Sequence, residues 1–144
     1  MGIRYYAHPV QPGFEATARD DPLEYLRGDD FHCFSVHREP VPPTLDLDKG
    51  WRDFQHLFGG PPGGSARPAL DLVRGDVIQS CCGWISFFAF RDSVVVREIA
   101  DDLESLDYAE SARDDPYLVE LLTRARLFTR SLAVEGMSLI YSIG

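Results

Sequence analysis

The segment from Thr44 to Phe58 constrains the fold more than any other part of the chain. Asp46 and Asp48 stand near its start, where carboxylates oppose the positive end of a helix dipole, and Gly59 follows it as a stop signal. Its apolar residues recur at helical spacing, at Leu47, Trp51, Phe54, Leu57 and Phe58. We therefore predict a helix over this segment, with its aromatic side turned into the core.

Aspartate caps predict three further helices. An Asp stands directly before the first helical residue at Asp21-Pro22, Asp92-Ser93 and Asp115-Pro116. Aspartate accepts hydrogen bonds from first-turn N–H groups, and proline suits the first helical position. The second of these helices is expected to reach Leu106. The third is the longest and is expected to run to about Val134, before Gly136. One more short helix is predicted over Pro12–Arg19.

Five segments have the composition of strands, and two features of them bear on the topology. The predicted strands are Ile3–Ala7, Ala69–Val73, Val77–Ser80, Trp84–Phe90 and Met137–Ile143. Gly75-Asp76 is a plausible tight turn, so the second and third segments are expected to form a hairpin. The last segment places Leu139, Tyr141 and Ile143 on one side and Ile140 on the other.

The order of these segments predicts the fold class. Strands and helices are mixed without strict β-α-β alternation, which indicates α+β. We expect one compact domain over residues 1–144, with a mixed or antiparallel sheet packed with about four helices. Phe31–Val36 fits either a strand or a short helical turn.

The charge and the apolar content exclude several kinds of partner. The chain has 144 residues with 23 acidic and 14 basic side chains, a net charge of −9. Such a chain repels phosphates, so no nucleic-acid partner is expected. No apolar stretch approaches the roughly 20 residues of a membrane helix, and the start lacks the apolar region of a signal peptide. We therefore expect no membrane partner and a cytoplasmic protein.

The cysteines indicate a reduced protein. Cys33, Cys81 and Cys82 form an odd set with one adjacent pair, which is not a disulfide framework. No Cys-x-x-Cys spacing or basic neighbour favours a reactive thiol at the pair. Buried structural cysteines are therefore the favoured interpretation, and redox activity is the alternative.

One block leads into an aromatic-rich helix that ends at Gly59-Gly60; it reads Leu45-Asp46-Leu47-Asp48-Lys49-Gly50-Trp51. This block resembles the YfbM-like proteins, a bacterial family of unknown function. The opening Met1-Gly2-Ile3 followed by aromatic residues, the stretch Glu98–Asp107 and the short apolar close ending in Gly144 are similar as well. The resemblance spans nearly the whole chain and implies a single α+β domain. It carries over no catalytic residue, because the family has no assigned reaction.

The best candidates for a binding site lie in the same block. Asp46, Asp48 and Lys49 could bind a cation or move protons, and Trp51 and His56 could face the same cleft. The alternative is structural: one Asp caps the helix, Lys49 pairs with a carboxylate and Trp51 fills the core. If the segment is extended instead of helical, Asp46 and Asp48 share one face.

No recognised spacing predicts a metal site, a cofactor or a catalytic set. The leading hypothesis is therefore a non-enzymatic binding or interaction protein with a basic protein partner, and one form of it is an immunity-type protein that neutralises a basic toxic enzyme. The alternative is a small-ligand-binding protein or an enzyme that uses the cleft around Asp46–Lys49. The oligomeric state and the presence of an activity stay open.

Overall fold

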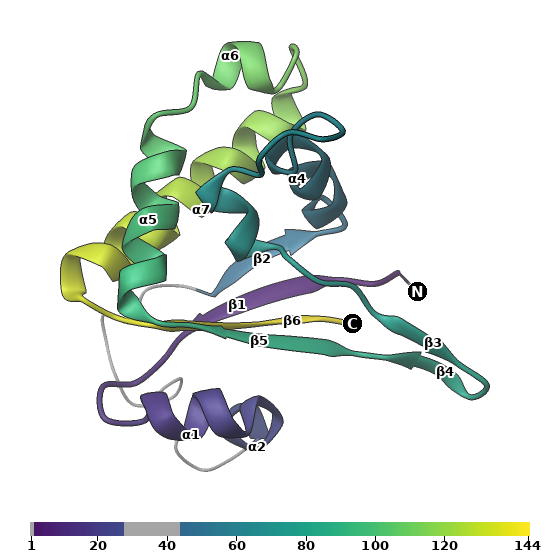
Figure 1. The fold of residues 1–144 in the computed structure, drawn as a ribbon, viewed down its shortest axis with the longest axis vertical. Helices are drawn as coiled ribbons and strands as arrows, with labels where there is room; N and C mark the ends of the chain where they lie inside the picture. The colour runs from purple at the N-terminus through teal and green to yellow at the C-terminus, as the bar shows by residue number, and fades with distance from the viewer. Residues whose placement is uncertain (1, 28–43) are drawn as a thin grey trace.

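A four-stranded antiparallel sheet organises the chain in the computed structural model, which describes residues 2–27 and 44–144 (Figure 1). Its strands are β1 (Tyr5–Pro9), β2 (Leu45–Asp48), β5 (Phe87–Arg91) and β6 (Leu139–Ile143). They lie in the order β2-β1-β6-β5, so the last strand along the chain is a central strand of the sheet. The predicted α+β class is confirmed.

Helices cover both faces of this sheet (Figure 1). One face carries α4 (Trp51–Phe58), the 3-10 helix η1 (Pro68–Leu72), α5 (Ser93–Glu104) and α7 (Pro116–Glu135). The other face carries α1 (Glu15–Asp20) and α2 (Pro22–Arg27), and the short α6 (Tyr108–Ser111) links α5 to α7. No helix in the described ranges has both the length and the apolar character needed to cross a bilayer.

The two faces have separate apolar cores, as the alternation in the last strand predicts. Leu139, Tyr141 and Ile143 belong to the large core under α5 and α7. Ile140 belongs to the small core under α1 and α2, where it packs with Val10, Ala18 and Tyr25. Because β6 is buried on both faces, its sequence is apolar at nearly every position.

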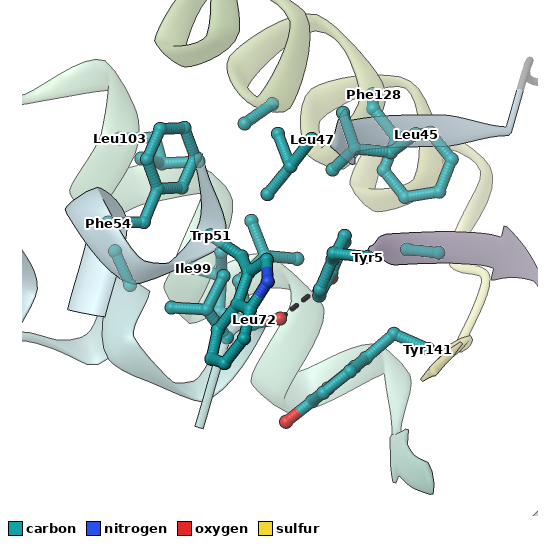
Figure 2. Packing of buried hydrophobic residues seen from close by; sticks show 14 of the residues in the cluster. Tyr5, Leu45, Leu47, Trp51, Phe54, Leu72, Ile99, Leu103, Phe128 and Tyr141 are labelled. Atoms are coloured by element: carbon teal, nitrogen blue, oxygen red, sulfur yellow. Dashed lines mark hydrogen bonds between the residues drawn. The ribbon is translucent and has the colours of Figure 1, made fainter. Parts of the chain in front are cut away.

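The aromatic side of α4 lies in the large core (Figure 2). Trp51 and Phe54 are buried there, as the helical spacing predicts. Tyr5 stacks on Tyr141, and its buried hydroxyl donates a hydrogen bond of 2.7 Å to the Leu72 carbonyl, drawn as a dashed line in Figure 2. Such a bond matters because an unpaired hydroxyl in this core would cost about 1–3 kcal/mol.

The helix predicted from Thr44 begins only at Trp51, so that boundary was wrong. Leu45–Asp48 is the edge strand β2, which pairs with β1 around an irregularity in the register. Its residues Leu45 and Leu47 are buried in the core. Gly50 then closes a turn in which its N–H donates to the Leu47 carbonyl at 2.8 Å. A β-carbon at Gly50 would clash with the Leu121 side chain. The apolar period therefore changes from two to 3.6 at Lys49-Gly50.

The hairpin predicted at Gly75-Asp76 was also wrong. Ala69–Val73 contains the η1 helix, and the hairpin in this region is formed by β3 (Ile78–Ser80) and β4 (Gly83–Ile85). Its turn consists of Cys81 and Cys82, both exposed, which corrects the expectation of buried cysteines. The predicted strand Trp84–Phe90 is accordingly interrupted at Ser86, between β4 and β5.

The aspartate caps are confirmed. Asp92 accepts a hydrogen bond from the Val95 N–H at 3.0 Å, and Asp115 accepts one from the Tyr117 N–H at 3.0 Å. The Asp21 carboxylate does the same for Glu24 at 3.0 Å. The first strand and the first helix begin two and three residues later than predicted, at Tyr5 and Glu15. Phe31–Val36 and Cys33 lie outside the described residues.

Candidate functional site

Asp46, Asp48 and Lys49 lie together at the exposed end of β2. The Asp46 carboxylate accepts a hydrogen bond of 2.8 Å from the Asp48 N–H. Asp48 has a φ of +46°, which is uncommon for any residue other than glycine, although aspartate tolerates it better than most. The side chain of Asp46 therefore stabilises the bend that ends the strand.

The Asp48 carboxylate is held by an arginine and is incompletely satisfied. Its Oδ1 is covered and has no hydrogen bond from the described residues, and the Arg4 Nε lies 3.4 Å away in an ion pair. Burial and then the negative charges of Asp48 and Asp46 raise the pKa of the Tyr117 phenol at the start of α7. The two carboxylates at the end of β2 therefore influence a side chain of α7.

The other two candidate residues lie elsewhere. Trp51 is buried in the core, where the Arg52 guanidinium lies over its ring at 4.4 Å from the centroid. His56 is exposed on α4 and lines a hollow of about 460 Å³. Asp46 lines a different hollow, of about 470 Å³, beside α7. Trp51 thus points into the core, and Asp46 and His56 line separate hollows. Binding by the five residues stays a prediction.

The hollow beside His56 combines polar side chains with an apolar floor. Asp53 and His56 come from α4, Ser111 from α6, and Arg113 from the loop before α7. Arg113 has a φ of +47°, so the loop that brings it there has a strained backbone. Among the residues that the structure describes, no group of three or more His, Cys, Asp or Glu is placed to hold a metal ion.

The β3–β4 hairpin is a candidate surface that the sequence analysis missed. Figure 1 shows it extending from the start of β5 away from the helices. Ile78, Trp84 and Ile85 are 64%, 58% and 54% exposed. The sequence predicts strands over Val77–Ser80 and Trp84–Phe90 but not that these side chains are exposed. The Cys-Cys-Gly turn is the local signal that could have located the hairpin. Large exposed apolar side chains gathered on one element are typical of interaction sites.

The base of this hairpin is fixed to α4. The Gln55 Nε2 donates hydrogen bonds of 2.6 Å to the carbonyls of Val73 and Gly75. One turn earlier, the Arg52 guanidinium forms an ion pair with Asp76 at 3.2 Å. The segment that enters β3 is therefore tied to the body of the protein, while the apolar residues beyond it face solvent.

Comparisons with known proteins identify the fold. No protein-family profile matches the chain, and no curated protein matches it. Among solved structures, the chain is similar to the crystal structure of YfbM from Escherichia coli, described as a protein of unknown function. The two are 17% identical, the match covers 99% of this chain and 100% of the other, and the TM-score is 0.52. The chain therefore has a YfbM-like fold, as the resemblance in the sequence implies.

Proposed function

We propose that this protein is a non-enzymatic interaction protein that binds a basic protein partner through the β3–β4 hairpin. The observation that carries the proposal is the exposure of Ile78, Trp84 and Ile85 on an element whose base is fixed. Aromatic residues are enriched at the centres of protein interfaces, where a few side chains provide most of the binding energy. A rigid apolar hairpin loses little conformational entropy on binding.

The charge of the chain supports a basic partner. A net charge of −9 attracts a positively charged protein over a distance of about one Debye length, roughly 8 Å at physiological salt. Short-range contacts of the hairpin would then hold the complex. An immunity-type protein that neutralises a basic toxic enzyme is one form of this proposal. It would likewise use the negative charge to attract the enzyme and the apolar hairpin to bind it.

The test compares the protein with Trp84→Ala in a capture experiment from its native host, with chemical cross-linking at low and high salt. We expect a reproducible basic partner whose cross-links map to residues 76–86. Trp84→Ala should weaken binding by about 2 kcal/mol, or thirty-fold. Leu127→Ala, an exposed apolar residue on α7, is the matched control and should bind normally. Equal capture by both variants would contradict the proposal.

Self-association is measured in parallel by sedimentation velocity. If the hairpin instead pairs with a second copy of the chain, the protein sediments as a dimer and Trp84→Ala converts it to a monomer. That result would replace the basic partner by the protein itself. A monomer over the whole concentration range is the result that the proposal requires.

A second candidate, binding of a small cationic ligand at the end of β2, follows from Asp48. Asp48 already forms an ion pair with the Arg4 guanidinium, so this end of the strand attracts charged N–H groups. A thermal-shift screen of amines and guanidines should then give a ligand response that Asp48→Asn abolishes and Lys49→Ala changes. Identical responses in the protein and both variants would remove this site from consideration.

A further inference from the structure

The turn of the β3–β4 hairpin presents two thiols side by side. Cys81 and Cys82 occupy the two turn positions, and both are exposed. Their Sγ atoms lie 3.5 Å apart. On a flexible loop the distance between two neighbouring thiols would vary widely, so a defined distance requires a turn with a fixed backbone.

Local hydrogen bonds hold the turn. The Ser80 hydroxyl donates to the Gly83 carbonyl at 3.1 Å and accepts from the Cys82 N–H at 3.3 Å. Gly83 has a φ of +128°, a conformation that strains residues with a β-carbon, so the unusual backbone angle falls on the glycine and not on either cysteine. The pair is therefore supported from both ends of the turn.

We propose that Cys81 and Cys82 form a bidentate site for a monosubstituted trivalent arsenical of the class R–As=O. The separation of the sulfurs selects this class. With bonds of about 2.3 Å, the length of a zinc–thiolate bond, sulfurs 3.5 Å apart subtend an angle of about 100° at a bridging atom. That angle suits pyramidal trivalent arsenic. A linear two-coordinate ion with bonds of that length would need sulfurs about 4.6 Å apart.

Competing uses of the pair fit less well. A direct disulfide requires the sulfurs to approach to about 2.05 Å, which strains the backbone between adjacent residues. Structural zinc takes four ligands, and the described residues supply no cluster of three His, Cys, Asp or Glu. A monosubstituted arsenical carries its third substituent with it, so two thiolates complete its coordination.

The binding reaction balances without a redox partner. Each thiol forms one As–S bond, the As=O bond breaks, and the oxygen leaves as one water molecule with both S–H protons. Arsenic stays trivalent and the sulfurs keep their oxidation state. The second As–S bond forms within the molecule, so the pair binds much more tightly than either thiol alone.

The experiment uses phenylarsine oxide and a full-length Cys33→Ser protein, in which only the pair remains. Intact mass should show one phenylarsenic group per chain, resistant to excess 2-mercaptoethanol and removed by dithiothreitol. Changes in Trp84 fluorescence, two residues from the pair, would follow the titration. Adding Cys81→Ser or Cys82→Ser should weaken binding at least about a hundred-fold.

Two controls keep the result decisive. Circular dichroism checks that each variant is folded, and Cys33→Ala replaces Cys33→Ser if the serine variant is not. Removal of the arsenical by the monothiol would overturn the proposal, as would equal affinity in the single-cysteine variants. The hairpin partner is absent from this experiment, so its outcome is independent of the proposed interaction function.

Discussion

Asp102 on α5 joins two parts of the fold, and its removal gives a quantitative test of the structure. One carboxylate oxygen accepts hydrogen bonds from the Ala69 N–H at 3.0 Å and the Arg67 Nε at 3.2 Å, and the other accepts one from the Arg67 Nη2 at 2.9 Å. The Asp102 side chain is only 12% exposed. It therefore fixes the start of η1 to α5.

The expected loss for Asp102→Ala is about 2–3 kcal/mol. Hydrogen bonds to a charged group contribute about 1.5–3 kcal/mol each, but bonds that share one carboxylate do not add. Arg67 is 39% exposed, so water screens its ion pair and reduces its share. The Ala69 N–H, in a fully buried residue, would lose its partner. For 144 residues, about 3 °C per kcal/mol converts this loss to a melting temperature lower by 6–9 °C.

Glu104→Ala is the matched control on the same helix. Glu104 forms an ion pair with Arg130 at 3.2 Å, and both side chains are exposed, so its loss should cost less than about 1 kcal/mol. Arg67→Ala should fall between the two, because the bond from Asp102 to Ala69 survives. Thermal and urea unfolding measure all three. Equal losses for Asp102→Ala and Glu104→Ala would refute the reasoning.

Three further predictions follow from glycine packing and from shifted pKa values. Gly75→Ala should destabilise the protein by more than about 2 kcal/mol in urea unfolding, because φ is +122° and a β-carbon would overlap the Phe87 ring. Gly63→Ala is the control and should destabilise the protein clearly less, because Gly63 has a φ of +79° but no atom within 4 Å of an added β-carbon. Burial lowers the pKa of His8 from 6.5 to about 4, so stability should fall as pH drops from 6.5 towards 4 and should then lose no more from this group. An NMR titration of the imidazole that gives a midpoint near 6.5 would contradict this. Burial raises the pKa of Tyr141 from 10.0 to about 12, so its contribution to stability should be constant below pH 10 and decline between pH 10 and 12. An absorbance titration should show that Tyr141 ionises at a higher pH in the folded protein than in the unfolded protein. Ionisation near pH 10 in the folded protein would contradict this prediction.

Local signals predicted the helix caps well. Asp92 and Asp115 act within three residues of themselves, so the chain around each cap contains all the information that the cap requires. The alternation predicted for β6 was also correct, because successive side chains of a strand point to opposite faces of the sheet whatever they pack against. These parts of the fold depend little on residues far along the chain.

Errors occurred where distant contacts decide the structure. Ala69–Val73 has strand-like composition, but the Asp102 carboxylate, 33 residues away, binds the Ala69 N–H and favours a helical turn. Gly75-Asp76 has turn composition, but Gln55 and Arg52 bind this segment as an entry to β3. Local sequence contains neither contact, so neither could be predicted.

The candidate site was predicted in part for the same reason. Asp46, Asp48 and Lys49 are adjacent in the chain and lie together at the end of β2. The helical spacing predicted that Trp51 is buried, and a side chain that fills the core does not line a cleft. The exposure of Trp84 was not predicted, because it follows from the position of the β3–β4 hairpin, which depends on contacts far along the chain.

The central place of β6 has a consequence for how the protein folds during synthesis. Both neighbours of β6 leave the ribosome before it, yet β1 and β5 have no hydrogen bonds to each other in the finished sheet. Nascent chains that end before Leu139 therefore lack the strand with which both β1 and β5 pair. Unpaired strand edges of this kind invite pairing with other molecules, so stalled or shortened chains are expected to aggregate.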